Sequence, residues 1–178
     1  MTMPESAGWP PSDPAFRRAE VSAVVGRGDD DWRRATHDLL RWAVKTRSGF
    51  QVDADGPVQP GQRERIRVRL PGATIVEPVE VVSVVERPDR VGFAYRTLPG
   101  HPVDGEEAFI LHRDGADGPI SLTVRSLTRR APQQPWRLLF PLLLVAQRVA
   151  KRRYLRALRP PAPDRRQGRA SRPFTAAP

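Results

Sequence analysis

The sequence from Val91 to His112 reads VGFAYRTLPGHPVDGEEAFILH. It starts with a strand pattern, breaks at Leu98-Pro99-Gly100, and resumes as a strand after Asp104-Gly105. The connection is short, so the two strands are expected to be antiparallel neighbours. This stretch also holds the densest set of chemically able side chains in the chain: Tyr95, Arg96, Thr97, His101, Asp104, Glu106 and Glu107. We therefore expect the functional site here.

Strand patterns continue on both sides of this central stretch. Alternating or β-branched runs occupy residues 18–25, 63–70, 77–86 and 120–128, with short Gly, Pro and Asp connections in the last part of the chain. In residues 30–45, apolar side chains recur at helical spacing and predict one helix. Its two tryptophans, Trp32 and Trp42, are expected in the core, since aromatic stripes at this spacing usually pack inward.

Residues 136–158 predict a long C-terminal helix, with Pro141 either kinking it or marking its first turn. One face carries Leu139, Leu143, Ala146, Ala150, Tyr154 and Ala157. A second apolar stripe beside it carries Leu138, Leu142, Val145 and Val149. A helix that is apolar on two sides needs two covers. One is a sheet, and the other could be a ligand, a partner subunit or a membrane surface.

Together these elements predict an α+β fold. A curled antiparallel sheet of about six or seven strands grips the long C-terminal helix, and one further helix lies near the N-terminus. This arrangement resembles that of helix-grip, or START-like, domains, many of which enclose an apolar cavity. We expect a disordered segment at 1–15, a single domain at 16–158, and a basic, disordered Pro/Arg-rich tail at 159–178.

Composition narrows the chemistry. The 178 residues include no cysteine and three histidines without ligand spacing, so we expect neither disulfides nor a metal site, and no cofactor. The longest apolar run, Leu138 to Ala146, is far below the roughly 20 residues of a membrane span, and no secretory signal is recognisable, so a cytoplasmic location is expected. The net charge is +10, which is the sum of +12 in residues 129–178 and −2 in residues 1–128.

Several motifs resemble a known family. Phe93-Ala-Tyr95, Thr97-Leu-Pro-Gly-His-Pro102, Gly105-Glu-Glu107 and Phe109 are similar to the signature of uncharacterised protein family 0548, the domain of unknown function DUF1990. Trp42, Gln147 and Tyr154-Leu155 agree with it. The resemblance covers about 16–158 and implies the helix-grip fold and the location of the site. Arg96 departs from the glycine expected there and would alter any pocket on its face.

Strand alternation requires either Glu106 or Glu107 to face the sheet interior, where a carboxylate needs a partner. The candidate partners are Tyr95, His101, Arg125 and Arg129. The candidate ligand-binding residues are Tyr95, Thr97, His101, Glu107, Gln147 and Tyr154. In one reading they orient the polar end of a small, mainly apolar ligand. In the other, Glu107 and His101 only tie down the Pro-Gly-His-Pro loop, and Gln147 and Tyr154 set the helix register.

Two further hypotheses stay open. An enzyme of the same fold would use His101 or Glu107 as acid or base, although no catalytic signature is recognisable. An interaction protein would use the basic C-terminal segment on an anionic partner, including a peripheral membrane contact. We expect no specific nucleic-acid binding, because aromatic side chains do not interleave the basic ones beyond Tyr154. The oligomeric state is not predicted.

Overall fold

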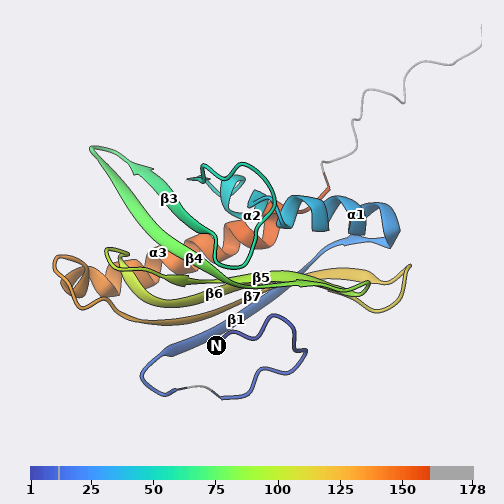
Figure 1. Ribbon diagram of the computed structural model, residues 1–178, viewed down its shortest axis with the longest axis horizontal. Helices are drawn as coiled ribbons and strands as arrows, with labels where there is room; N and C mark the ends of the chain where they lie inside the picture. The colour runs from blue at the N-terminus through green and yellow to red at the C-terminus, as the bar shows by residue number, and fades with distance from the viewer. Residues whose placement is uncertain (12, 161–178) are drawn as a thin grey trace, which may run out of the picture.

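The computed structural model describes residues 1–11 and 13–160. One antiparallel sheet of seven strands, in the order β1-β7-β6-β5-β4-β3-β2, curls around three helices (Figure 1). The strands are β1 Arg17–Arg27, β2 Phe50–Gln51, β3 Arg63–Leu70, β4 Ala73–Glu86, β5 Arg90–Thr97, β6 Val103–Arg113 and β7 Pro119–Arg130. The helices are α1 Gly28–Leu39, α2 Ala43–Thr46 and α3 Trp136–Ala157. The predicted helix-grip fold is confirmed.

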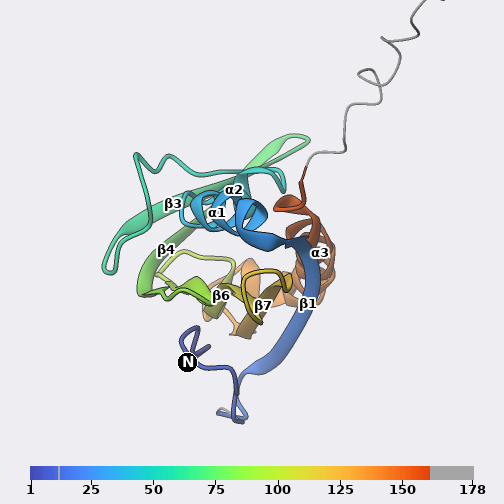
Figure 2. The same ribbon diagram turned by 90° about the vertical axis from the view of Figure 1, so that its right-hand side faces the viewer.

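The central stretch forms the β5–β6 hairpin. Its register pairs Phe93 with Phe109 and Tyr95 with Glu107, so that aromatic and acidic side chains from both strands meet on the concave face. All three helices cover that face (Figure 2), and the main core lies between it and them. Both predicted core tryptophans are buried, Trp32 beneath the Arg113 guanidinium and Trp42 in edge-on contact with the Phe93 ring. Among the described helices, none has the length and hydrophobicity needed to cross a bilayer.

The first helical segment differs from the single helix predicted over 30–45. α1 ends at Leu39, and Trp42 adopts a left-handed backbone conformation (φ 62°, ψ 12°) before the short α2 begins. A non-glycine residue in this conformation costs about 1–2 kcal/mol. Trp42 is almost fully buried against Phe93 and Tyr95, and burial of so large a side chain offsets that cost. The break redirects α2 and brings Lys45 over the centre of the sheet.

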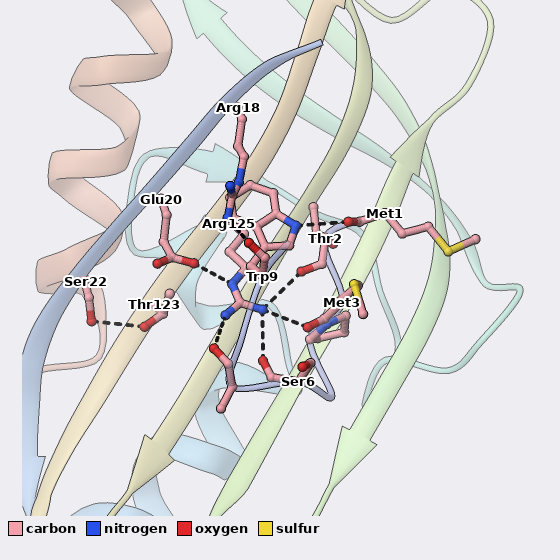
Figure 3. A network of polar contacts seen from close by, with 12 residues as sticks. Met1, Thr2, Met3, Ser6, Trp9, Arg18, Glu20, Ser22, Thr123 and Arg125 are labelled. Atoms are coloured by element: carbon pink, nitrogen blue, oxygen red, sulfur yellow. Dashed lines mark hydrogen bonds and ion pairs between the residues drawn. The ribbon is translucent and has the colours of Figure 1, made fainter. Parts of the chain in front are cut away.

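The N-terminal segment, residues 1–11, differs from the expected disorder. It packs on the convex face of the sheet, opposite the helices (Figures 1 and 2). The buried Arg125 of β7 holds it there (Figure 3). Its guanidinium donates to the carbonyl oxygens of Met3, Ser6 and Ala7 at 2.8–3.0 Å and pairs with Glu20 at 2.6 Å. The proline-rich composition predicted disorder here. It could not reveal the packing, because the contacts are made by backbone carbonyls, which every sequence has. The predicted tail beyond residue 160 lies outside the described residues.

Replacing Arg125 with methionine should release the N-terminal segment. Several buried carbonyls would lose their donor at once, so we expect the free energy of unfolding to fall by about 3 kcal/mol. Amide hydrogen exchange in residues 2–11 should become fast while β5 and β6 stay protected. The matched control is Arg129→Met, since Arg129 is half exposed on the same strand and pairs with Asp104 at the surface. Unchanged protection of the segment in Arg125→Met would show that other contacts hold it.

Candidate functional site

A buried ion pair lies at the centre of the concave face. The Lys45 ammonium from α2 donates to Oε2 of Glu107 on β6 at 3.0 Å and to the hydroxyl of Tyr154 on α3 at 2.8 Å. Tyr95 on β5 donates its hydroxyl proton to the same Glu107 oxygen at 2.5 Å. The aromatic rings of Phe50, Tyr95, Phe109 and Tyr154 surround the ammonium at 4.8–5.6 Å. Five elements, α2, α3, β2, β5 and β6, therefore meet at one charge pair, where cation–π attraction adds to the Coulomb attraction.

This arrangement explains the protonation states of its members. Burial alone would raise the pKa of the Glu107 carboxyl, but the Lys45 charge and the hydrogen bonds from Tyr95 and Lys45 outweigh it and lower the pKa. Glu107 is therefore an ionised carboxylate. Burial, reinforced by the nearby Glu107 charge, raises the pKa values of Tyr95 and Tyr154 well above the ordinary 10.0. Both phenols consequently keep their protons; Tyr95 donates its proton to Glu107, and the Tyr154 oxygen accepts from Lys45.

A cavity of about 360 Å³ opens beside this ion pair, between the sheet and α3. Its apolar walls come mainly from β3, β4 and α3, with Val68, Ile75 and Leu143 among them. All six sequence-predicted candidates line it: Tyr95, Thr97, His101, Glu107, Gln147 and Tyr154. Strand register brings the β5 and β6 residues together, and the two-turn spacing of Gln147 and Tyr154 places both on the sheet-facing side of α3.

The loop between β5 and β6 is locked by two of those candidates. Nδ1 of the buried His101 lies 2.8 Å from the Val103 carbonyl oxygen and 3.1 Å from the Val103 amide nitrogen, so it bonds the loop backbone in either tautomer. Thr97 Oγ1 accepts one from the Gly105 N–H at 2.9 Å, and the His101 carbonyl accepts one from Gln133 at 3.0 Å. Burial lowers the pKa of His101 to about 4, so its ring is neutral. His101 and Thr97 thus make contacts that fix the loop, as expected if their role is to hold the Pro-Gly-His-Pro segment in place.

Among the expected partners of the inward carboxylate, the structure supports Tyr95 alone. Arg125 lies on the convex face with the N-terminal segment, Arg129 pairs with Asp104, and His101 bonds the loop backbone. The inward residue of the acidic pair is Glu107, while Glu106 accepts hydrogen bonds from Thr2. Arg96 also points away from the cavity, because its side chain is mostly exposed and pairs with Glu80. The departure from the family pattern therefore leaves the cavity unchanged.

Sequence reasoning missed both lysines and Glu77. Lys45 neutralises Glu107, and Lys151 on α3 donates to the Ser126 hydroxyl at 2.7 Å beside the cavity. A signal was available, since these are the only two lysines among 30 basic residues. A compact ammonium with three donors fits between buried oxygens where a planar guanidinium does not. Glu77 gave no such signal, because a single acidic residue in a strand that alternates between two faces is ordinary.

Glu77 is the second carboxyl of the cavity. Within residues 1–11 and 13–160, no hydrogen bond or ion pair reaches its side chain, although it lines the cavity wall. Burial raises its pKa, and the nearby Glu107 charge adds to this, while Lys45 opposes it. Glu77 and Glu107 therefore differ in proton affinity within one cavity, and Glu77 has unused hydrogen-bonding capacity. In the described part of the chain, no three His, Asp or Glu side chains gather as metal ligands would.

Fold and site together define a helix-grip domain with a partly polar internal cavity. Residues 2–157 match the family described as Domain of unknown function (DUF1990), and the chain belongs to that family. A UPF0548 protein of Deinococcus radiodurans is 34% identical over 154 residues, spanning 75% of this chain and 72% of that protein. The UPF0548 protein At2g17695 of Arabidopsis thaliana is 28% identical over 114 residues, or 61% of this chain and 55% of that protein.

Solved structures agree on the fold. The hypothetical protein jhp0584 of Helicobacter pylori superposes with a TM-score of 0.58 at 15% identity, covering 89% of this chain and 96% of that one. A protein from Arthrobacter aurescens gives a TM-score of 0.52 at 15% identity, covering 82% and 87%. At such low identity these likenesses concern the fold alone.

The buried ion pair can be tested by a double-mutant cycle. Lys45→Met would leave the Glu107 carboxylate buried without its counter-charge, and we expect the free energy of unfolding to fall by about 3–5 kcal/mol. Adding Glu107→Gln should recover part of this loss, because the stranded charge disappears. Urea unfolding of the two single variants and the double variant measures the coupling. Arg63→Met, which breaks an exposed pair with Glu80, should change the free energy of unfolding little, because solvent screens such a pair. Additive losses in the cycle would contradict direct pairing.

The buried neutral His101 predicts a pH dependence of stability. Its pKa falls from 6.5 to about 4 on folding, so between these pH values the unfolded chain binds a proton that the folded chain does not. This contribution to stability is complete above pH 6.5 and is lost as the pH falls toward 4. The loss is at most about 3 kcal/mol.

The measurement is urea unfolding of the wild type and of His101→Gln at several pH values across that window. Groups other than His101 titrate in both proteins, so the difference between the two profiles isolates His101. We expect the variant to be less stable at pH 7 and its profile to be flatter. The control is His37→Gln, which alters an exposed imidazole on α1. Parallel profiles for wild type and His101→Gln would show that His101 titrates alike in both states.

Proposed function

We propose that the protein binds a small, mainly apolar molecule with one polar end in the cavity between the sheet and α3. The observation that carries this proposal is the cavity of about 360 Å³, which has aliphatic walls and several polar side chains at its base. Small-molecule sites in proteins are commonly concave, largely apolar and on the order of 300–1,000 Å³, with a few polar groups that fix the orientation.

The polar groups indicate what the bound end must offer. The Tyr154 oxygen accepts a hydrogen bond from Lys45, so its own proton is available to a ligand. Within the described residues, neither the Gln147 amide nor the Glu77 carboxyl has a hydrogen-bond partner, and both line the cavity. Donors and acceptors are thus present side by side. A ligand end that both donates and accepts, such as a hydroxyl or a carboxamide, fits this set.

We assign no catalytic role to His101 or Glu107. Nδ1 of His101 is engaged by the loop backbone, and Glu107 is engaged by Lys45 and Tyr95. A proton-transfer reaction at either group would therefore have to break the hydrogen bonds that hold it in place. The same contacts support the binding proposal, because a fixed loop and a neutralised carboxylate give the cavity a preformed base.

The proposal is tested with a probe of matching chemistry. N-phenyl-1-naphthylamine is apolar, carries one N–H donor and fluoresces in apolar surroundings. We expect the wild type to bind it with saturation at one equivalent. Val68→Trp should weaken binding at least tenfold, since Val68 lines the cavity and an indole would occupy its volume. The matched control is Val76→Trp on the adjacent strand, a half-exposed position outside the cavity lining, which should bind as the wild type does.

Native mass spectrometry of the purified protein then identifies what the cavity takes from a bacterial cell. An added mass of a few hundred daltons, present in the wild type and in Val76→Trp but absent from Val68→Trp, would name the ligand class. If the fluorescent probe bound all three proteins equally, the cavity would not be its site. If no protein bound the probe or retained a small molecule, the binding proposal would be overturned.

A further inference from the structure

The outer face of α3, turned away from the sheet, is apolar. Leu138, Leu142, Val145 and Val149 are 77%, 66%, 55% and 44% exposed. They recur every three or four residues, so at 100° per residue they form one continuous stripe along the first half of the helix. Single exposed apolar residues are ordinary on a soluble protein, but a continuous patch of them marks a contact surface.

Cationic side chains flank this stripe. α3 contains no acidic residue, and it carries Arg137, Arg148, Lys151, Arg152, Arg153 and Arg156. The helical repeat places Arg148 and Arg152 on one side of the stripe and Arg153 on the other, with Arg156 continuing its line. Within residues 1–11 and 13–160, the side chains of Arg148, Arg152 and Arg156 have no ion-pair or hydrogen-bond partner, and all three residues are exposed. Their charges therefore face outward unneutralised.

The cavity opens toward this same side. Leu70 at the end of β3 is 49% exposed and Val149 of α3 is 44% exposed, yet both line the cavity. Its mouth consequently lies between the end of the β3–β4 hairpin and the outer part of α3. Figure 1 shows this hairpin reaching beyond the central strands, toward the end of the molecule where α3 begins. We call the α3 stripe, its flanking arginines and Leu70 the portal face.

We propose that the portal face docks on an anionic lipid bilayer, with α3 lying in the plane of the interface and the cavity mouth toward the lipid. An apolar stripe bordered by arginines is the composition of a helix that inserts its apolar side among acyl chains while its cations meet anionic headgroups. A second copy of this chain fits the face less well. A symmetric contact would place two acid-free, cationic helices against each other without counter-charges.

Vesicle sedimentation with the full chain tests the docking. The probes are vesicles of pure phosphatidylcholine and vesicles with 30% phosphatidylglycerol in phosphatidylcholine. We expect strong binding to the anionic vesicles, at least tenfold weaker binding to the neutral ones, and weakening when salt rises from about 50 to 500 mM. Leu142→Glu/Val145→Glu should reduce anionic-vesicle binding at least tenfold. The matched control is Val76→Glu/Val82→Glu, two exposed valines of β4 outside the cavity lining, which should bind as the wild type does.

Two other results would contradict the docking proposal, and the variants distinguish them. If the α3 double variant bound vesicles as well as the wild type, the portal face would not be the docking surface. If the wild type bound no vesicles but formed a dimer by light scattering, and the α3 double variant were monomeric, the stripe would be a contact between copies and the proposal would be overturned. Circular dichroism and thermal melting check that each variant folds. Docking does not depend on ligand binding, so Val68→Trp should retain vesicle binding even where it loses the naphthylamine probe.

Discussion

The buried pair of Lys45 and Glu107 is the interaction on which the rest of the structure depends. It joins α2 to β6 directly and reaches β5 and α3 through the hydroxyls of Tyr95 and Tyr154. Two charges so far from water are tolerable only when each is neutralised and hydrogen-bonded, and here each is. The left-handed backbone conformation at Trp42 is what positions Lys45 for this pair. It ends α1, starts α2 and delivers Lys45 to the carboxylate of Glu107 on the concave face of the sheet.

The same pair determines the character of the cavity. Because Glu107 is already neutralised, the base of the cavity presents the Tyr154 hydroxyl, the Gln147 amide and the Glu77 carboxyl rather than a bare charge. Burial raises the pKa of Glu77 while the ion pair lowers that of Glu107, so the two carboxyls of the cavity differ in proton affinity. An apolar space with such a base discriminates among ligands by their polar end, since a buried polar group left unpaired is costly.

The sequence predicted the parts of this molecule that depend on periodicity. Strand alternation placed Tyr95 and Glu107 on one face, and helical spacing put Gln147 and Tyr154 toward the sheet. It failed where distant segments meet. The partner of Glu107 is a lysine 62 residues earlier in the chain, and its position depends on a backbone turn that buried tryptophan packing stabilises. The carbonyl cluster around Arg125 is equally invisible, because backbone groups leave no mark on composition.

The two faces of the sheet then show why the outer stripe of α3 requires a separate explanation. On the convex face, the N-terminal segment covers the central strands, and Arg125 fixes it there. On the concave face, α3 needs only its inner side to complete the core, which Tyr154 and Leu158 do near its end. Nothing in the fold requires Leu138, Leu142 or Val145 to be apolar, and their exposure favours aggregation. Polar residues there would leave the core and the ion pair intact. Within residues 1–11 and 13–160 no segment covers this stripe or pairs with Arg148, Arg152 and Arg156, and this supports the proposed contact with an anionic surface.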